Sequence, residues 1–122
     1  MSQKIEKFTD LNAWREAHKF GIDIYKATRS FPKEEVFGLT SQIRRAVVSV
    51  SSNIAEGFSR YNAAEKKNFY RIAKGSLVEV ESQLLIARDV GYLNKEVTNK
   101  LLDQAETTGK LLTGLINGVS NR

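Results

Sequence analysis

The chain has 122 residues, of which 41% are hydrophobic and 27% are charged, and this composition suits one globular domain spanning residues 1–122. Cysteine is absent, which excludes disulfides, thiolate metal sites and cysteine nucleophiles. No signal-peptide pattern opens the sequence, and no apolar run approaches the roughly 20 residues needed to span a bilayer. We therefore expect a cytoplasmic protein without membrane contact.

The first expected helix covers about residues 10–30, with Thr9 or Asp10 as its N-cap. It carries two neighbouring apolar stripes at helical spacing, which together are wider than one bundle interior requires. One stripe is Leu11, Trp14, His18, Gly21, Tyr25 and Thr28, and the other is Ala13, Ala17, Phe20, Ile24, Ala27 and Phe31. The surplus apolar arc predicts a second contact, most simply with another copy of the chain.

The second expected helix covers residues 33–56, with Pro32 suited to its first turn and Gly57 as its C-terminal stop. Its positive end is complemented by Glu34 and Glu35. Between residues 36 and 58 the only charged residues are Arg44, Arg45 and Glu56. So few charges indicate a helix that is packed on more than one side.

The third and fourth expected helices cover residues 63–90 and 95–116, capped by Asn62 and Asn94. The inward stripe of the third is expected to be Phe69, Ile72, Ala73, Ser76, Val80, Leu84 and Ala87. That of the fourth is expected to be Val97, Leu101, Ala105, Thr108, Leu112 and Leu115. Small residues near Ala46 and Ser76 should let the second and third backbones approach closely. Four amphipathic helices joined by short loops predict an all-α, antiparallel up-down-up-down four-helix bundle.

The formal charge of +5 is concentrated in residues 41–75, which hold seven basic residues against two acidic ones, while the remainder holds twelve of each. Such a concentration favours a polyanionic partner, because Lys and Arg neutralise phosphates, and exposed tyrosines can stack on bases. The candidate nucleic-acid-binding residues are Arg60, Lys66, Lys67, Arg71, Lys74, Arg44, Tyr61 and Tyr70. The alternative for the same residues is an ordinary solvated face, and no recognised nucleic-acid-binding motif is present.

A polar stripe on the second helix, together with Glu79 of the third, has two interpretations. Its residues are Gln42, Arg45, Ser49, Asn53 and Glu56. They could form a ligand or active site, but without a nucleophile or a metal-ligand cluster we favour a buried polar network or subunit interface. His18, the only histidine, is expected to be a packed structural residue, and we expect no metal and no cofactor.

The segment from Gln42 to Gly57 has the form Q-I-R-R-A-x-x-S-x-x-x-N-I-A-E-G, and a Gly-Ser-Leu step begins at Gly75. With FTDLNAWREAHKF near the start, these segments make nearly the whole chain resemble the bacterial 23S rRNA intervening-sequence proteins. Ser51 stands where many relatives have a proline that would kink the helix. The resemblance implies a helical protomer that assembles into a ring or barrel, commonly a pentamer. It also implies a fold similar to the accessory protein of diversity-generating retroelements, which binds nucleic acid and a reverse transcriptase.

Taken together, the residues and the resemblance predict a non-enzymatic homo-oligomer that binds RNA or DNA through a repeated basic surface, with little sequence readout. The alternative is a structural or protein-interaction scaffold without nucleic-acid binding. A nuclease acting on rRNA ranks last, because Glu56 and Glu79 alone provide neither a metal site nor a general base. A reverse transcriptase as protein partner rests on the fold analogy only.

Overall fold

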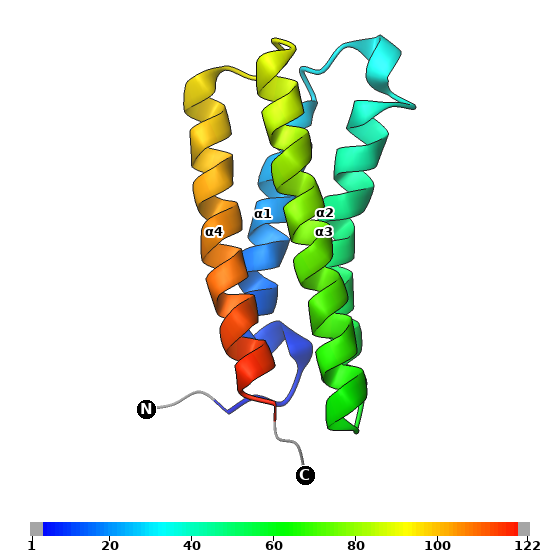
Figure 1. Cartoon of the computed structure of the whole chain (residues 1–122), viewed down its shortest axis with the longest axis vertical. Helices are drawn as coiled ribbons and strands as arrows, with labels where there is room; N and C mark the ends of the chain where they lie inside the picture. The colour runs from blue at the N-terminus through cyan, green and yellow to red at the C-terminus, as the bar shows by residue number, and fades with distance from the viewer. Residues whose placement is uncertain (1–3, 120–122) are drawn as a thin grey trace.

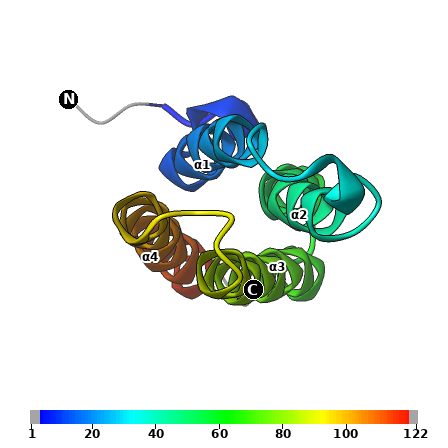
Figure 2. The same cartoon turned by 90° about the horizontal axis from the view of Figure 1, so that it is seen from above.

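The computed structural model describes residues 4–119, which form four long helices and two short 3-10 turns. The elements are η1 (Phe8–Asp10), α1 (Asn12–Thr28), η2 (Lys33–Glu35), α2 (Leu39–Ser59), α3 (Ala63–Asp89) and α4 (Lys95–Asn117). Each long helix runs antiparallel to the next one along the chain (Figure 1). Seen from above, the helices stand at the corners of a square in the order α1, α2, α3, α4 (Figure 2). The predicted all-α four-helix fold is confirmed.

The core lies between the four helices and takes one face from each of them. On α1 it is the predicted stripe containing Phe20 and Ile24, both fully buried. In the other α1 stripe, Thr28 is buried, and Leu11 and Trp14 are half-buried against the core. Of its remaining members, His18 and Tyr25 are exposed. On α3 the predicted inward stripe is partly wrong, because Ile72 is 45% exposed whereas Tyr70 and Leu77 are buried.

A close contact with α2 at Gly57 explains why α3 turns Tyr70 rather than Ile72 toward the core. A Cβ atom at this position would lie 2.6 Å from Cε1 of Tyr70, so the missing side chain makes room for the tyrosine ring. Higher up, the hydroxyls of Ser49 and Ser76 are hydrogen-bonded at 2.8 Å. The two helices approach closely through small residues as expected, but Ser49 rather than Ala46 lies against Ser76. The predicted stop at Gly57 is wrong, since α2 continues to Ser59 with Gly57 buried inside it.

The starts of the four helices agree only in part with the predictions. Asn62 and Asn94 cap α3 and α4 as expected, accepting from backbone N–H groups at 2.9 and 2.8 Å. Asp10 instead caps η1, because its carboxylate accepts from the backbone of residues 6 and 7, and α1 begins only at Asn12. Pro32 precedes the short η2 rather than α2, which begins at Leu39.

Glu35 connects three segments at the upper end of the bundle. One carboxylate oxygen accepts from the backbone N–H of Leu39 at 3.0 Å, which satisfies the first turn of α2. The other oxygen accepts from the hydroxyl of Tyr92 at 2.7 Å, in the loop between α3 and α4. The Leu39 N–H, and then the Tyr92 hydroxyl, hold the pKa of Glu35 below its ordinary value of 4.5. Ionised Glu35 therefore stabilises this end of the fold.

Replacing Glu35 with glutamine should lower the melting temperature at pH 7, and the loss should shrink in acid. A carboxyl with a depressed folded-state pKa stabilises above its unfolded-state value, and the contribution disappears as the pH falls through the folded value. The measurement is the melting temperature of both proteins between about pH 7 and pH 3. The matched control is Glu34→Gln, because Glu34 is exposed in the same turn. A difference between wild type and Glu35→Gln that stays constant across this range would contradict the role of ionised Glu35.

The outer surfaces of the helices differ in character. The outer face of α4 carries charges of both signs, including the ion pairs Lys100–Glu96 at 3.8 Å and Lys110–Glu106 at 3.4 Å. The outer surfaces of α1, α2 and α3 are more apolar, with the exposed residues Ile22, Tyr25, Val48, Ile72 and Ile86. Across residues 4–119, none of the helices combines the length and apolar character needed to span a bilayer.

Candidate nucleic-acid interface

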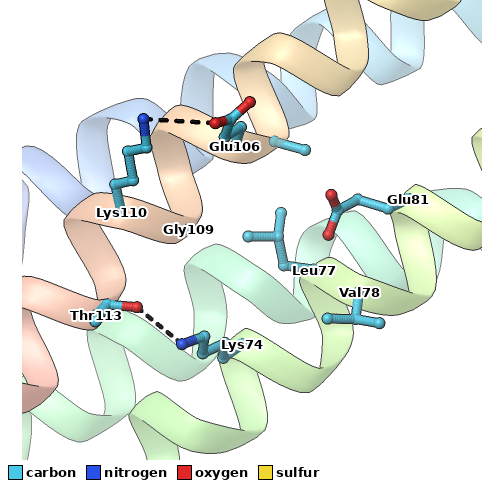
Figure 3. A pocket seen from close by; sticks show the side chains of 9 residues that line it. Lys74, Leu77, Val78, Glu81, Glu106, Gly109, Lys110 and Thr113 are labelled. Carbon is cyan, nitrogen blue, oxygen red and sulfur yellow. Dashed lines mark hydrogen bonds and ion pairs between the residues drawn. The ribbon is translucent and has the colours of Figure 1, made fainter.

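Three basic residues lie on the side of α3 that borders α4. Arg71 and Lys74 are exposed and Lys67 is half-buried, and their spacing of four and three residues places them on one helical face. The ammonium group of Lys74 donates to the hydroxyl of Thr113 on α4 at 2.8 Å. Lys110 on α4 lines the same surface hollow as Lys74 (Figure 3). We call these four residues, Lys67, Arg71, Lys74 and Lys110, the basic strip.

The hollow between α3 and α4 has a volume of about 380 Å³. It marks the end of the positively charged surface along α3. Leu77, Val78 and Gly109 form part of its wall, while Glu81 and Glu106 bring negative charge to it (Figure 3). An anion is therefore attracted to the part of the strip nearer the α2–α3 loop, around Arg71 and Lys74, and is repelled further along α3.

Two predicted binding residues at the α2–α3 loop are occupied with structural contacts. Lys66 donates to the backbone carbonyls of Phe58 at 2.8 Å and Gly57 at 3.3 Å, thereby capping the C-terminal end of α2. Burial lowers the pKa of Lys66. The Arg60 guanidinium donates to Glu56 at 2.7 Å and lies 4.8 Å from the Phe69 ring centre, so its charge is largely compensated.

The two candidate tyrosines have opposite environments. Tyr61 is fully exposed in the α2–α3 loop and remains able to stack on a base. Tyr70 is 2% exposed, so its prediction as a stacking residue is wrong, because its ring fills the space beside Gly57. Arg44 lies on the α1 side of α2, donating to Thr28 at 2.9 Å, and is therefore remote from the basic strip.

The comparisons with known proteins agree with the fold. Residues 9–114 match the family of 23S rRNA-intervening sequence proteins. The chain belongs to this family. Its fold is also similar to the crystal structure of a protein of unknown function from the S23 ribosomal protein family of Bacteroides thetaiotaomicron. The two share 23% sequence identity and a TM-score of 0.76, over 85% of this chain and 97% of that chain. No curated protein matches the chain significantly.

The family is named for intervening sequences of 23S rRNA, which points to an RNA-related role. Neither the family description nor that of the Bacteroides protein names a catalytic activity. In the described part of this family member, no group of three or more His, Cys, Asp or Glu side chains is arranged to hold a metal ion. His18 is exposed and stacks on Trp14, with ring centres 4.7 Å apart.

The polar stripe on α2 is only partly buried in this family member. Asn53 donates to both the backbone carbonyl and the hydroxyl of Ser49, at 2.8 and 2.9 Å, and these half-buried residues join the contact with Ser76. The other four predicted members are exposed in the single chain: Gln42, Arg45, Glu56 and Glu79. The prediction that they too belong to a buried network within the protomer is wrong, since they lie beyond the edge of the helix contact. Their place in a subunit interface stays a prediction.

Lys110 is the residue of the basic strip that sequence reasoning did not single out. It lies outside the region of excess charge, and its neighbour Glu106 makes it look like part of an ordinary solvated face. The signal was present in the predicted topology, because antiparallel pairing of α3 with α4 places residues 110–113 beside residues 74–77.

Proposed function

We propose that this family member is a non-catalytic homo-oligomer that binds RNA or DNA through the basic strip. The observation that carries the proposal is the absence of acidic residues from the part of α3 that holds three of the four strip residues. Residues 66–78 contain no acidic residue. The fourth strip residue, Lys110 on α4, pairs instead with Glu106 one turn earlier, as Lys100 does with Glu96. A solvated helix surface has no need of such a one-sided distribution of charge.

Binding would be driven mainly by the release of counterions from phosphates, with little sequence discrimination. Tyr61 offers an exposed ring at the nearby loop, on which an unpaired base could stack. Assembly of several copies would repeat the strip and multiply weak contacts with one nucleic acid. The exposed apolar residues of α1, α2 and α3 support assembly, and the resemblance favours a pentamer. The reverse-transcriptase partner stays a prediction from fold analogy.

The proposal predicts that Arg71→Gln combined with Lys74→Gln weakens binding to a generic RNA duplex by about tenfold or more at low salt. Each lost phosphate contact should also reduce the slope of log affinity against log salt by about 0.9. Fluorescence anisotropy over a salt series measures both quantities, with a single-stranded RNA of equal length as a second probe. If Tyr61→Ala lowers the affinity for the single-stranded RNA more than the affinity for the duplex, a base stacks on the Tyr61 ring.

The matched control for this experiment is Lys95→Gln combined with Lys100→Gln, which removes the same charge from exposed positions of α4. Equal losses for the two double variants would show that net charge alone, rather than the basic strip, governs binding. No detectable binding by the wild-type protein at low salt would overturn the proposal in favour of the scaffold interpretation.

A further inference from the structure

A shallow apolar groove separates α1 from α2 on one side of the square. It has a volume of about 390 Å³, and its lining includes Gly21, Ile22, Tyr25 and Val48. Three of these residues, Ile22, Tyr25 and Val48, are more than 40% exposed although they are large and apolar. The rim of the groove is basic because Lys26 and Arg29 border it. We call this site the α1–α2 groove.

The outward surface of α3 carries a complementary feature. Ile72, Gly75, Glu79, Ser82 and Ile86 follow one another at spacings of three and four residues, which is the repeat that helices use to pack along one another. All five are exposed in the single chain. No atom lies within 4 Å of the position that a Gly75 side chain would take. We call this row the α3 seam.

We infer that the α3 seam of one copy of the chain packs into the α1–α2 groove of the next copy. This inference rests on the homo-oligomer part of the proposed function and names the surfaces that meet. The charges favour this pairing, because acidic Glu79 lies in the seam and Lys26 and Arg29 border the groove. In the single chain, the hydrogen bond that Glu79 makes is to the amide of Gln83 on its own helix.

The heights of the two features along the bundle also agree. Gly21 lies beside Val47, and Ser49 is bonded to Ser76, so residues 72–79 of α3 stand level with about residues 15–22 of α1. α1 and α3 run in the same direction (Figure 1). Two copies in the same orientation can therefore join without sliding past each other. Gly75 then faces the His18–Gly21 turn, where the absence of a side chain lets the helices approach.

The alternative pairings of identical faces are less favourable. Seam against seam would bring Glu79 towards its own copy, and groove against groove would bring Lys26 and Arg29 towards theirs. The groove lies between α1 and α2, whereas the seam follows α3, the next helix around the square (Figure 2). A contact between two different faces closes into a ring when the rotation between copies permits. The basic strip, on the α4 side of α3, stays uncovered.

The first test introduces bulk into the seam with Gly75→Leu and into α4 with Gly114→Leu. Both glycines are exposed, helical and without neighbours at the Cβ position, so both variants should fold. Sedimentation velocity and mass photometry should show that Gly75→Leu raises the dissociation constant of the assembly by about tenfold or more, while Gly114→Leu leaves it unchanged. Circular dichroism verifies helix content in each variant.

The second test exchanges the charges across the contact. Glu79→Lys and Lys26→Glu should each weaken assembly, and the double variant should recover part of the loss, because the opposite charges are restored in reversed order. Assembly that persists unchanged in Gly75→Leu and in both single charge variants would overturn this interface while leaving the oligomer intact. A wild-type protein that is monomeric at tens of micromolar would overturn both, and RNA binding by the monomer would still be judged by its own experiment.

Discussion

Replacement of Ile24 with alanine is expected to lower the free energy of unfolding by about 2 to 5 kcal/mol. Ile24 is fully buried on the inward stripe of α1, so truncation removes three carbons from the core and leaves a cavity that the surrounding helices can fill only in part. Urea denaturation followed by circular dichroism at low protein concentration measures the change. Domains of this length are only marginally stable, so the variant is expected to melt well below the wild type.

The same helix offers a control of the same residue type two positions earlier. Ile22 is 45% exposed and lies outside both predicted apolar stripes, so Ile22→Ala should change the free energy of unfolding by less than about 1 kcal/mol. Equal effects of the two substitutions would mean that α1 is rotated from the orientation described above. The comparison therefore tests which face of α1 lies against the core.

Substitution of alanine for Gly57 is expected to destabilise the fold by about 1 to 3 kcal/mol, although alanine is the better helix former by about 1 kcal/mol. The added Cβ would meet Cε1 and Cδ1 of Tyr70 at 2.6 and 2.8 Å and the Cβ of Phe69 at 3.1 Å. The Tyr70 ring is buried, so relieving this clash requires the ring to shift within the core or α2 and α3 to separate. Denaturation curves give the sign as well as the size of the effect.

Gly114→Ala is the matched control, because Gly114 is exposed in α4 with open space around its Cβ position. At this position only the higher helix propensity of alanine acts, and it should stabilise the fold by up to about 1 kcal/mol. A Tyr70→Leu background should reduce the penalty at Gly57, since the two residues are in contact. Stabilisation by Gly57→Ala in the wild-type background would refute the close approach at this position.

The periodic pattern and the asparagine caps were sufficient to predict four helices and their order. The predicted helix ends were wrong where one residue type is compatible with two structural roles. Gly57 has the character of a helix stop but serves as a space for a tyrosine ring, and only the packing of α3 distinguishes the two. Pro32 and Glu35 are typical of a helix start, yet Glu35 caps α2 from outside it, with Tyr92 as a partner far along the chain.

The candidate interface was predictable as a region but not residue by residue. The excess of charge in residues 41–75 identified Lys67, Arg71 and Lys74, which α3 presents together. The sequence could not show that Lys66 is engaged with the end of α2 or that Arg60 is paired with Glu56, because both contacts depend on the geometry of the loop. One-residue differences in helix rotation likewise decided that Tyr70 is buried.

The charged outer face of α4 limits how the proposed assembly can grow. Its bases and acids pair along the helix, as Glu96 with Lys100 and Glu106 with Lys110, and within residues 4–119 no large apolar side chain of α4 is exposed to a neighbour. Each copy then has one groove and one seam, and it can link to two others at most. Such units connect only in single file, as a closed ring or an unbranched filament, and cannot extend into a sheet or a disordered network.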